Sequence, residues 1–257
     1  AVPGGGAGAP AAHRGPERGE AFLQRILDYR YQVRQTVDKL IREQPLELPI
    51  SKDSFWWVIL MGIDHERIHL ETSSVIMRRA ALHYMQPSAM WPSCELGRFS
   101  TDPDSDAAQV LPNNLLPVEG GTTRFGRKWE GTALYGWDNE FSDEPRHVHV
   151  EPFKASRYLV TNREFFDFFR ADGYKEQRYW SEEGWEWLQE SGASMPIFWR
   201  KQDRKWYLRG LAEVTAMPWD WPAEVSNHEA TAYCNFLKEK TGEPIRLPTE
   251  AEYCRLR

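Results

Sequence analysis

One ten-residue segment, GIDHERIHLE at positions 62–71, carries the residues best suited to chemistry in this sequence. Its two histidines, His65 and His69, are four positions apart. On an α-helix, side chains at this spacing lie about 40° apart around the axis, one turn above the other. Both imidazoles can then reach one metal ion, and neutral imidazole is a common metal ligand. We therefore expect His65 and His69 to bind a metal, with structural hydrogen bonds on a helix face as the alternative.

Two glutamates in the segment widen the range of possible reactions. His65, Glu66 and His69 together match HExxH, the zinc-protease pattern in which the glutamate is the general base. The extended pattern HExxHxxGxxH is absent, so a zinc hydrolase is a minor alternative. Glu71 lies about 200° around the helix from His69 and points away from a shared metal. We expect Glu71 to pair with Arg67 or to orient a ligand through a hydrogen bond.

Two long amphipathic helices are predicted to position this segment. In residues 20–43, apolar side chains recur every three or four positions, with charged and polar residues on the opposite face. Pro45 and Pro49 end this helix, and residues 51–54 offer N-caps for a second helix over residues 55–84. Two long helices joined by a short turn are typical of an antiparallel pair in a bundle. His83 would then lie at the C-terminal end of the second helix and interact with its dipole.

Composition divides the chain into four regions. Residues 1–19 are rich in Gly, Ala and Pro and predict a disordered tail, whereas residues 20–85 form the helical metal-binding region. Residues 86–117 lack any period and predict an interdomain linker with docked turns. Residues 118–257 alternate short strand-like segments with turns and helices, which indicates an α+β domain. Because a helical pattern has just begun at Arg257, we expect the sequence to be a fragment of a longer protein.

Overall composition excludes several classes of protein. The 257 residues carry a net charge of -6 without a basic stripe, so we expect no nucleic-acid partner. The longest apolar run, residues 55–63, is far shorter than the ~20 residues of a membrane helix, and we expect no leader segment, because the first residues lack a charged-then-apolar pattern. Three cysteines without a CxxC pair argue against a disulfide framework and a thiolate zinc site. These features predict a protein of the cytoplasm without a membrane partner.

Other histidines and tryptophans in the second half have structural explanations. His147 and His149 alternate in HVHV and would share one strand face, where solvent exposure is favoured over a metal pair. A set of tryptophans could form a surface for stacking sugars or peptides, but packing under irregular loops is favoured. That set is Trp180, Trp185, Trp187, Trp219 and Trp221. The segment TNREFFDFFRADG, residues 161–173, predicts a helix with its cap at Thr161 or Asn162.

The sequence resembles the non-haem iron sulfoxide synthases. GIDHERIHLETSS is similar to the HxxxHxE segment of their DinB-like domain, and its surroundings resemble the branch that makes 5-histidylcysteine sulfoxide for ovothiol. Downstream, LYGWDNEF, PFKASRYLVTNREFFDFF, MPWDWPAEVSNHEATAYCNF and TGEPIRLPTEAEY resemble the formylglycine-generating-enzyme-like, C-type-lectin-like domain of these enzymes. The resemblance covers Gly19 to Arg257. It implies an α-helical part followed by an α+β part: a partial DinB-like bundle and a partial formylglycine-generating-enzyme-like domain.

The resemblance also implies a reaction and a cofactor. An Fe(II) enzyme of this family uses O2 to couple the sulfur of cysteine to C5 of the histidine imidazole. His65 and His69 match two of its three iron-binding histidines. The third lies on an earlier helix of the family's bundle, whereas only His13, within the predicted disordered tail, precedes the pair here. The family's catalytic tyrosine is expected beyond Arg257, so the fragment itself is expected to be inactive or only weakly metal-binding.

Three other functions remain open at this stage. A sister enzyme acts on trimethylated histidine in ergothioneine synthesis and would share most of the motifs above. A zinc hydrolase would use Glu66 as its base. A non-catalytic binding module would rely on the lectin-like half and need no metal. Turnover with trimethylhistidine would favour the ergothioneine enzyme. Peptide cleavage with retained zinc would favour the hydrolase, and folding without metal would favour the binding module.

Overall fold

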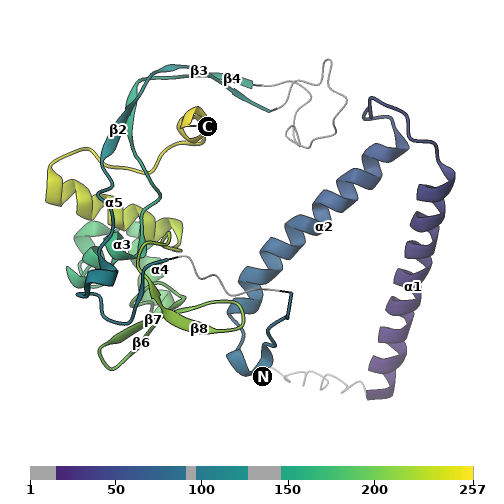
Figure 1. Ribbon diagram of the computed structural model, residues 1–257, viewed down its shortest axis with the longest axis horizontal. Helices are drawn as coiled ribbons and strands as arrows, with labels where there is room; N and C mark the ends of the chain where they lie inside the picture. Colours follow the sequence, from purple (N-terminus) through teal and green to yellow (C-terminus); the bar gives the residue numbers. More distant parts are fainter. Residues whose placement is uncertain (1–15, 91–96, 127–145, 257) are drawn as a thin grey trace, which may run out of the picture.

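The chain forms a pair of long helices and a domain of short strands and helices (Figure 1). The computed structural model describes residues 16–90, 97–126 and 146–256. Helices α1 (Pro16–Glu43) and α2 (Phe55–Arg78) run in opposite directions, and we call them the helical arm. The elements from β1 onward form the sheet domain. The quoted block LYGWDNEF and the predicted tail as far as residue 15 lie outside the described residues.

Helix α2 begins as the sequence predicts but ends earlier. The Ser54 side chain accepts a hydrogen bond from the backbone N–H of Trp56 at 3.2 Å, and the Trp56 indole donates to the carbonyl of Pro45 at 2.8 Å. The helix ends at Arg78, because Ala81 has an extended backbone (φ -61°, ψ 138°). Leu82–Tyr84 form a separate 3-10 helix, η1. The expected helix to residue 84, with a histidine at its dipole end, is therefore wrong.

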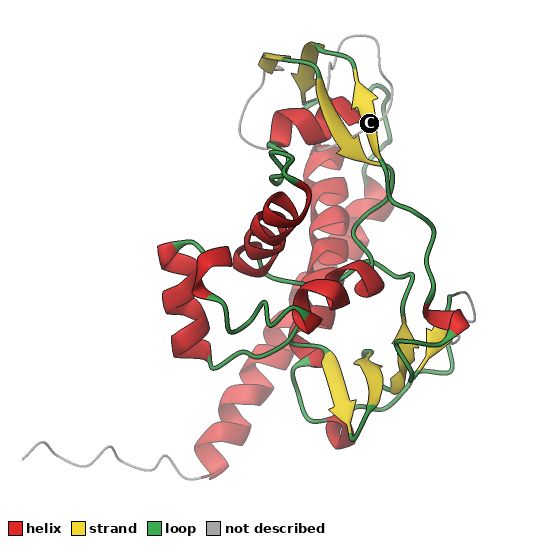
Figure 2. Ribbon diagram, turned by 90° about the vertical axis from the view of Figure 1, so that its left-hand side faces the viewer, coloured by secondary structure: helices red, strands yellow, loops and turns green. Residues whose placement is uncertain are grey.

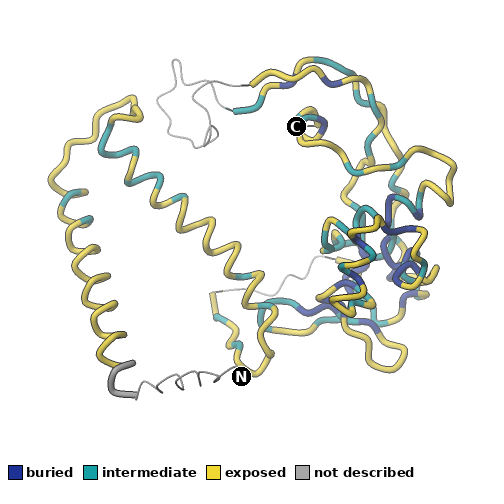
Figure 3. Tube along the Cα trace, turned by 180° about the vertical axis from the view of Figure 1, so that it is seen from behind, coloured by how far each residue is buried: buried dark blue, intermediate teal, exposed yellow. Residues whose placement is uncertain are grey.

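The helical arm is exposed along most of its length (Figure 3). Helix α2 contains no buried residue. The apolar stripe that the periodicity predicts is present, but the described residues leave large apolar side chains of both helices in solvent. They include Phe22, Leu23, Ile26, Val58, Ile63, Ile68 and Leu70. Among residues 16–90, 97–126 and 146–256, no helix is long and apolar enough to cross a membrane.

The sheet domain contains one four-stranded antiparallel sheet and two separate antiparallel ribbons (Figure 2). The four-stranded sheet has the order β1-β8-β7-β6, and the ribbons are β2-β5 and β3-β4. The bounds are β1 Phe99–Ser100, β2 Leu115–Val118, β3 Gly121–Phe125, β4 Arg146–Val150, β5 Phe153–Ser156, β6 Trp199–Gln202, β7 Lys205–Arg209 and β8 Val214–Pro218.

Much of the segment expected to be a linker is part of the sheet domain. Phe99 in β1 pairs with Pro218 in β8. A short 3-10 helix, η2 (Asp106–Ala108), follows and places Ala108 in the core with no exposed surface. The sheet domain thus begins by Phe99 instead of residue 118. A two-residue strand is too short to show alternation, so the period-free sequence indicated only a linker.

The helices of the sheet domain begin at side-chain caps. They are α3 (Asn162–Arg170), α4 (Glu182–Ser191), α5 (Asn227–Thr241) and α6 (Glu250–Leu256), with a 3-10 helix η3 (Gln177–Tyr179) before α4. Capping boxes, in which Ser or Thr and the Glu three residues later bond each other's backbone N–H, begin α3, α5 and α6. Their pairs are Thr161 with Glu164, Ser226 with Glu229 and Thr249 with Glu252. The expected cap at Thr161 is confirmed.

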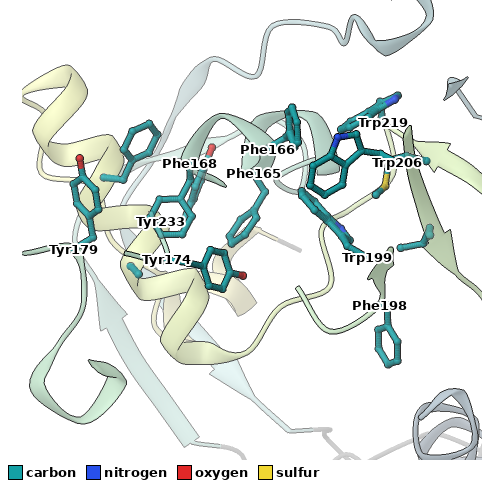
Figure 4. Packing of buried hydrophobic residues seen from close by; sticks show 14 of the residues in the cluster. Phe165, Phe166, Phe168, Tyr174, Tyr179, Phe198, Trp199, Trp206, Trp219 and Tyr233 are labelled. Carbon is teal, nitrogen blue, oxygen red and sulfur yellow. The ribbon is translucent and has the colours of Figure 1, made fainter. Parts of the chain in front are cut away.

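An aromatic core lies between α3, α5 and the four-stranded sheet (Figure 4). Phe165, Trp199 and Trp219 are each at most 2% exposed. Asn162 is buried among them, donates to the carbonyl of Pro218 at 2.9 Å and accepts from the Trp199 indole at 3.1 Å. Of the five tryptophans considered for stacking, Trp180 and Trp219 are buried, and Trp185, Trp187 and Trp221 pack against the core. The packing interpretation is therefore confirmed.

Substitution Glu252→Gln should destabilise the protein in a pH-dependent way. Hydrogen bonds from Arg246 and then Thr249 lower the pKa of Glu252 to about 2 from its usual 4.5. A lowered pKa in the folded state gives stability that is complete above the unfolded-state pKa and is lost as the pH falls toward 2. Because Arg246 is 61% exposed, we expect only about 1 kcal/mol at pH 7.

Urea unfolding followed by circular dichroism at pH 7, 5 and 3 measures this effect. The difference between wild type and Glu252→Gln should be complete at pH 7 and shrink toward pH 3. Glu250→Gln, an exposed change in the same helical turn, is the matched control and should leave stability within about 0.5 kcal/mol of wild type. A difference that is constant from pH 7 to pH 3 contradicts the assigned charge interaction.

Candidate metal centre

The two histidines singled out from the sequence lie together on α2. The ring centroids of His65 and His69 are 4.5 Å apart, with the ring planes at 87°. Both residues are exposed, so a metal ion and further ligands could reach them from solvent. The helical spacing thus brings the imidazoles to one face. They could supply two nitrogen donors to one metal.

The acidic neighbours of the pair are arranged differently from the expectation. Arg67, expected to pair with Glu71, instead has an ion pair with Asp64, at 3.8 Å. The backbone carbonyl of Glu71 accepts a hydrogen bond from the Ser74 hydroxyl at 2.6 Å. Glu66 is exposed on the helix. A role for Glu71 in orienting a metal ligand therefore stays a prediction.

The donor set fits part of an iron site. Two imidazoles are suitable ligands for Fe(II), and a site with few protein ligands leaves positions for substrates and O2. Within the described ranges, no group of three or more His, Cys, Asp or Glu side chains is placed to hold a metal ion. His13, the only histidine before the pair, lies outside the described residues. His65 and His69 can therefore be assigned only as two members of a larger set.

A second pair of histidines lies on strand β4 and faces solvent. His147 and His149 are exposed and pair across the β3-β4 ribbon with Arg124 and Thr122. The His149 Nε2 atom is 3.3 Å from the Glu151 carboxylate. The solvent-exposed interpretation of this pair is confirmed.

The C-terminal end of α2 is attached to the sheet domain by a cluster that the sequence analysis missed. The guanidinium of Arg78 donates to the backbone carbonyl of Arg209 at 2.7 and 3.2 Å and forms an ion pair with Glu224 at 2.7 Å. Its Cζ atom lies 3.7 Å from the centroid of the Phe198 ring. The partners of Arg78 are more than 100 positions away in sequence, and no local pattern predicts such contacts.

A buried polar pair also escaped the sequence analysis. The Tyr174 hydroxyl donates a hydrogen bond to the Glu229 carboxylate, and both residues are less than 9% exposed. Burial first, and then the charge of Glu229, raise the pKa of Tyr174 far above its usual value. Tyr174 therefore stays protonated at neutral pH and acts as a donor that joins the segment after α3 to the start of α5.

The fold and the site together define a class of protein. A helical arm with an exposed histidine pair precedes a mixed domain whose short antiparallel strands and capped helices surround an aromatic core. This is the architecture that the resemblance to formylglycine-generating-enzyme-like proteins implied for the second domain. Residues 100–255 match the family model described as the sulfatase-modifying factor enzyme 1-like domain. The chain belongs to this family.

Characterised relatives are enzymes. The chain is 40% identical over 118 residues to the hercynine oxygenase of Mycobacterium tuberculosis, a match that covers 45% of this chain and 25% of that protein. The hercynine oxygenase of Mycolicibacterium smegmatis is 34% identical over 124 residues, which cover 48% and 26%. The formylglycine-generating enzyme of Thermomonospora curvata is 28% identical over 177 residues, which cover 60% and 52%. The chain thus spans about a quarter of the hercynine oxygenases.

Proposed function

We propose that this chain belongs to a sulfoxide synthase that uses Fe(II) and O2 to couple the sulfur of cysteine to C5 of a histidine imidazole. The observation that carries the proposal is the side-by-side arrangement of His65 and His69 on α2. The membership in the sulfatase-modifying factor family and the relatives named hercynine oxygenase support it. The acceptor we propose first is histidine itself, with 5-histidylcysteine sulfoxide, the ovothiol precursor, as the product.

The proposed reaction balances without a further reductant. The thiol hydrogen, the imidazole C5 hydrogen and O2 are consumed, and the product is a sulfoxide carrying the new carbon–sulfur bond, together with one water. The two substrates supply all four electrons that O2 accepts. Bound Fe(II) would supply the redox centre for this electron transfer.

The proposal assigns roles to three side chains of α2 and to the helix itself. His65 and His69 would hold the metal through one nitrogen each, and their exposure would leave its other positions accessible to both substrates. Helix α2 would keep the two nitrogens at a fixed separation. Glu71 would orient a ligand through a hydrogen bond.

A second candidate substrate is hercynine, the trimethylated histidine. The observation that favours it is that the relatives at 34–40% identity carry the name hercynine oxygenase. Both acceptors carry the same imidazole ring, and they differ at the amino group. An uncharged or acidic contact for a primary amine would favour histidine, whereas an aromatic contact would favour the quaternary ammonium.

Anaerobic Fe(II) titration of the complete protein, followed by O2 uptake with cysteine and either acceptor, tests the proposal. We expect a coupled sulfoxide by mass spectrometry with histidine, and at least about ten-fold less with hercynine. The reverse preference would move the assignment to the ergothioneine branch.

Other outcomes of the same experiment would reject the proposal. Retained zinc with peptide hydrolysis that depends on Glu66 would support a hydrolase. Neither iron nor product, in a folded protein, would support a non-catalytic binding module. Omission of cysteine is the control for O2 uptake by iron alone.

A further inference from the structure

The attachment of α2 to the sheet domain has the features of a specific joint. We call it the arginine clamp and define it as Arg78, Phe198, Arg209 and Glu224. Arg78 lies in the last turn of α2, and its side chain is only 13% exposed. Its planar guanidinium stacks on Phe198, donates to the carbonyl of Arg209 through two nitrogens and pairs with Glu224. A flat group with several fixed donors suits this set of partners.

Arg209 is the second arginine of the clamp, and it also lies close to the end of α2. Arg209 is 3% exposed, and its guanidinium donates to the carbonyls of Gly210 and, at 2.7 Å, of Leu211. It also lies 3.5 Å from the carbonyl of Ala80, just after α2. Burial, with the positive charges of Arg200 and Arg78, lowers the pKa of Arg209. Two arginines held close together are costly unless their charges are compensated, and Glu224 supplies a counter-charge.

Because α2 continues from the joint to the histidine pair as one helix, the angle at the joint determines where the two imidazoles lie. Arg78 is nine residues from His69 and thirteen from His65, which corresponds to about 14 and 20 Å along the helix. A tilt of about 10° at the joint would move the two imidazoles by about 2–3 Å relative to the sheet domain. A misplacement of about 1 Å in an active site can lower a rate by about 100-fold.

We propose that Arg78 is a positioning residue, which fixes the angle of α2 and thereby sets the position of the metal-binding pair relative to the sheet domain. The proposal rests on the function proposed above, because it assumes that the reaction takes place at His65 and His69. It assigns Arg78 no contact with substrate or metal. No residue of α2 is buried, and the contacts of Arg78 join the end of this helix to the sheet domain, so its orientation can be set at the joint.

Three variants of the complete protein test this role. Arg78→Ala removes the clamp, and Arg78→Lys keeps the charge opposite Glu224 but loses the planar stack and the paired donation. Arg79→Ala is the matched control, because Arg79 is exposed and adjacent in sequence. Backbone hydrogen exchange of residues 76–84 reports the joint without any metal. Fe(II) stoichiometry, kcat, and coupled product per O2 consumed report the reaction.

A positioning role predicts a specific combination of results. In Arg78→Ala, exchange in residues 76–84 should rise by about ten-fold or more, while one Fe(II) still binds. Product per O2 should fall by about ten-fold, since oxygen is consumed without correct alignment. Arg78→Lys should lie between Arg78→Ala and wild type, and Arg79→Ala should match wild type. Simple loss of folded protein would lower product and O2 uptake together and leave their ratio unchanged.

Each contrary result has a definite meaning. Unchanged exchange in Arg78→Ala would show that the clamp does not hold α2 and would overturn the proposal. Raised exchange with unchanged product per O2 would show a joint without a positioning role, which also overturns it. If wild type itself makes no coupled product, the proposed function fails and the positioning role fails with it. The exchange data would then still decide whether the joint exists.

Discussion

Replacing His65 or His69 by alanine is expected to abolish stoichiometric Fe(II) binding and coupled product in the complete protein. Each change removes one of two adjacent imidazole donors whose ring centroids are 4.5 Å apart. Mutation of a residue that only hydrogen-bonds to a metal ligand lowers metal affinity or activity by about 10–100-fold. Loss of a ligand that binds the metal directly should lower the affinity further. Because both side chains are exposed, the folded state should be little affected.

Anaerobic titration with Fe(II), with thermal unfolding as a check on folding, measures this effect. Glu66→Gln is the matched control, since it changes a residue between the two histidines without removing a donor to the metal. It should leave iron binding and carbon–sulfur coupling largely intact. Full iron binding by His65→Ala would exclude the pair as the metal site. Complete loss of activity in Glu66→Gln with zinc bound would instead support the hydrolase.

Substitution Trp199→Ala should give a large loss of stability in the sheet domain, about 3–5 kcal/mol. Trp199 is 2% exposed, contacts the rings of Phe165, Phe166 and Trp206, and donates its indole N–H to Asn162. Alanine leaves a cavity at this position and also removes a partner from the buried amide. Both consequences destabilise the folded state.

Urea unfolding followed by far-ultraviolet circular dichroism measures the loss without relying on tryptophan emission. Trp199→Phe is the conservative comparison: it keeps most of the ring volume and removes the hydrogen bond to Asn162. It should cost about 1–3 kcal/mol. A loss below about 1 kcal/mol for Trp199→Ala would mean that the core described around this residue does not carry the stability of the domain.

The elements with strong local signals could be predicted from the sequence. The two arm helices follow from apolar side chains at three- and four-residue intervals, and Ser54 and Thr161 act as the caps that their positions suggested. Three capping boxes have the pattern Ser or Thr followed three residues later by Glu, so they too could have been found. In each case the evidence lies within a few consecutive residues.

The elements that depend on distant partners could not be predicted. Strand β1 exists because Phe99 pairs with Pro218, 119 positions later, and nothing in two residues shows a strand period. The end of α2 was placed too late because residues after Arg78 remain good helix formers, while their contacts with the sheet domain select another backbone. The role of Arg78 depends wholly on such contacts.

In the candidate site, too, the local feature could be predicted from the sequence and the features that depend on distant elements could not. The spacing of His65 and His69 predicted their position on one helix face, and the two rings lie 4.5 Å apart between centroids in the structure. A metal site needs more ligands than this pair, and those ligands come from other elements whose approach no local pattern specifies. The remaining ligands and the choice between histidine and hercynine therefore depend on tertiary contacts and need the experiments above.

The capping glutamates of the sheet domain have a consequence for how the domain unfolds. Besides capping its own helix, Glu164 lies 3.5 Å from the amide nitrogen of Asn113, Glu229 accepts from Tyr174, and Glu252 pairs with Arg246. Each helix start is thus tied to a segment outside its helix. In α3 and α5, fraying of the first turn would break a long-range contact together with a local one, because Asn113 and Tyr174 are more than 50 positions from their partners. Helices α3 and α5 should therefore lose their structure together with the segments they contact instead of melting one by one from their ends.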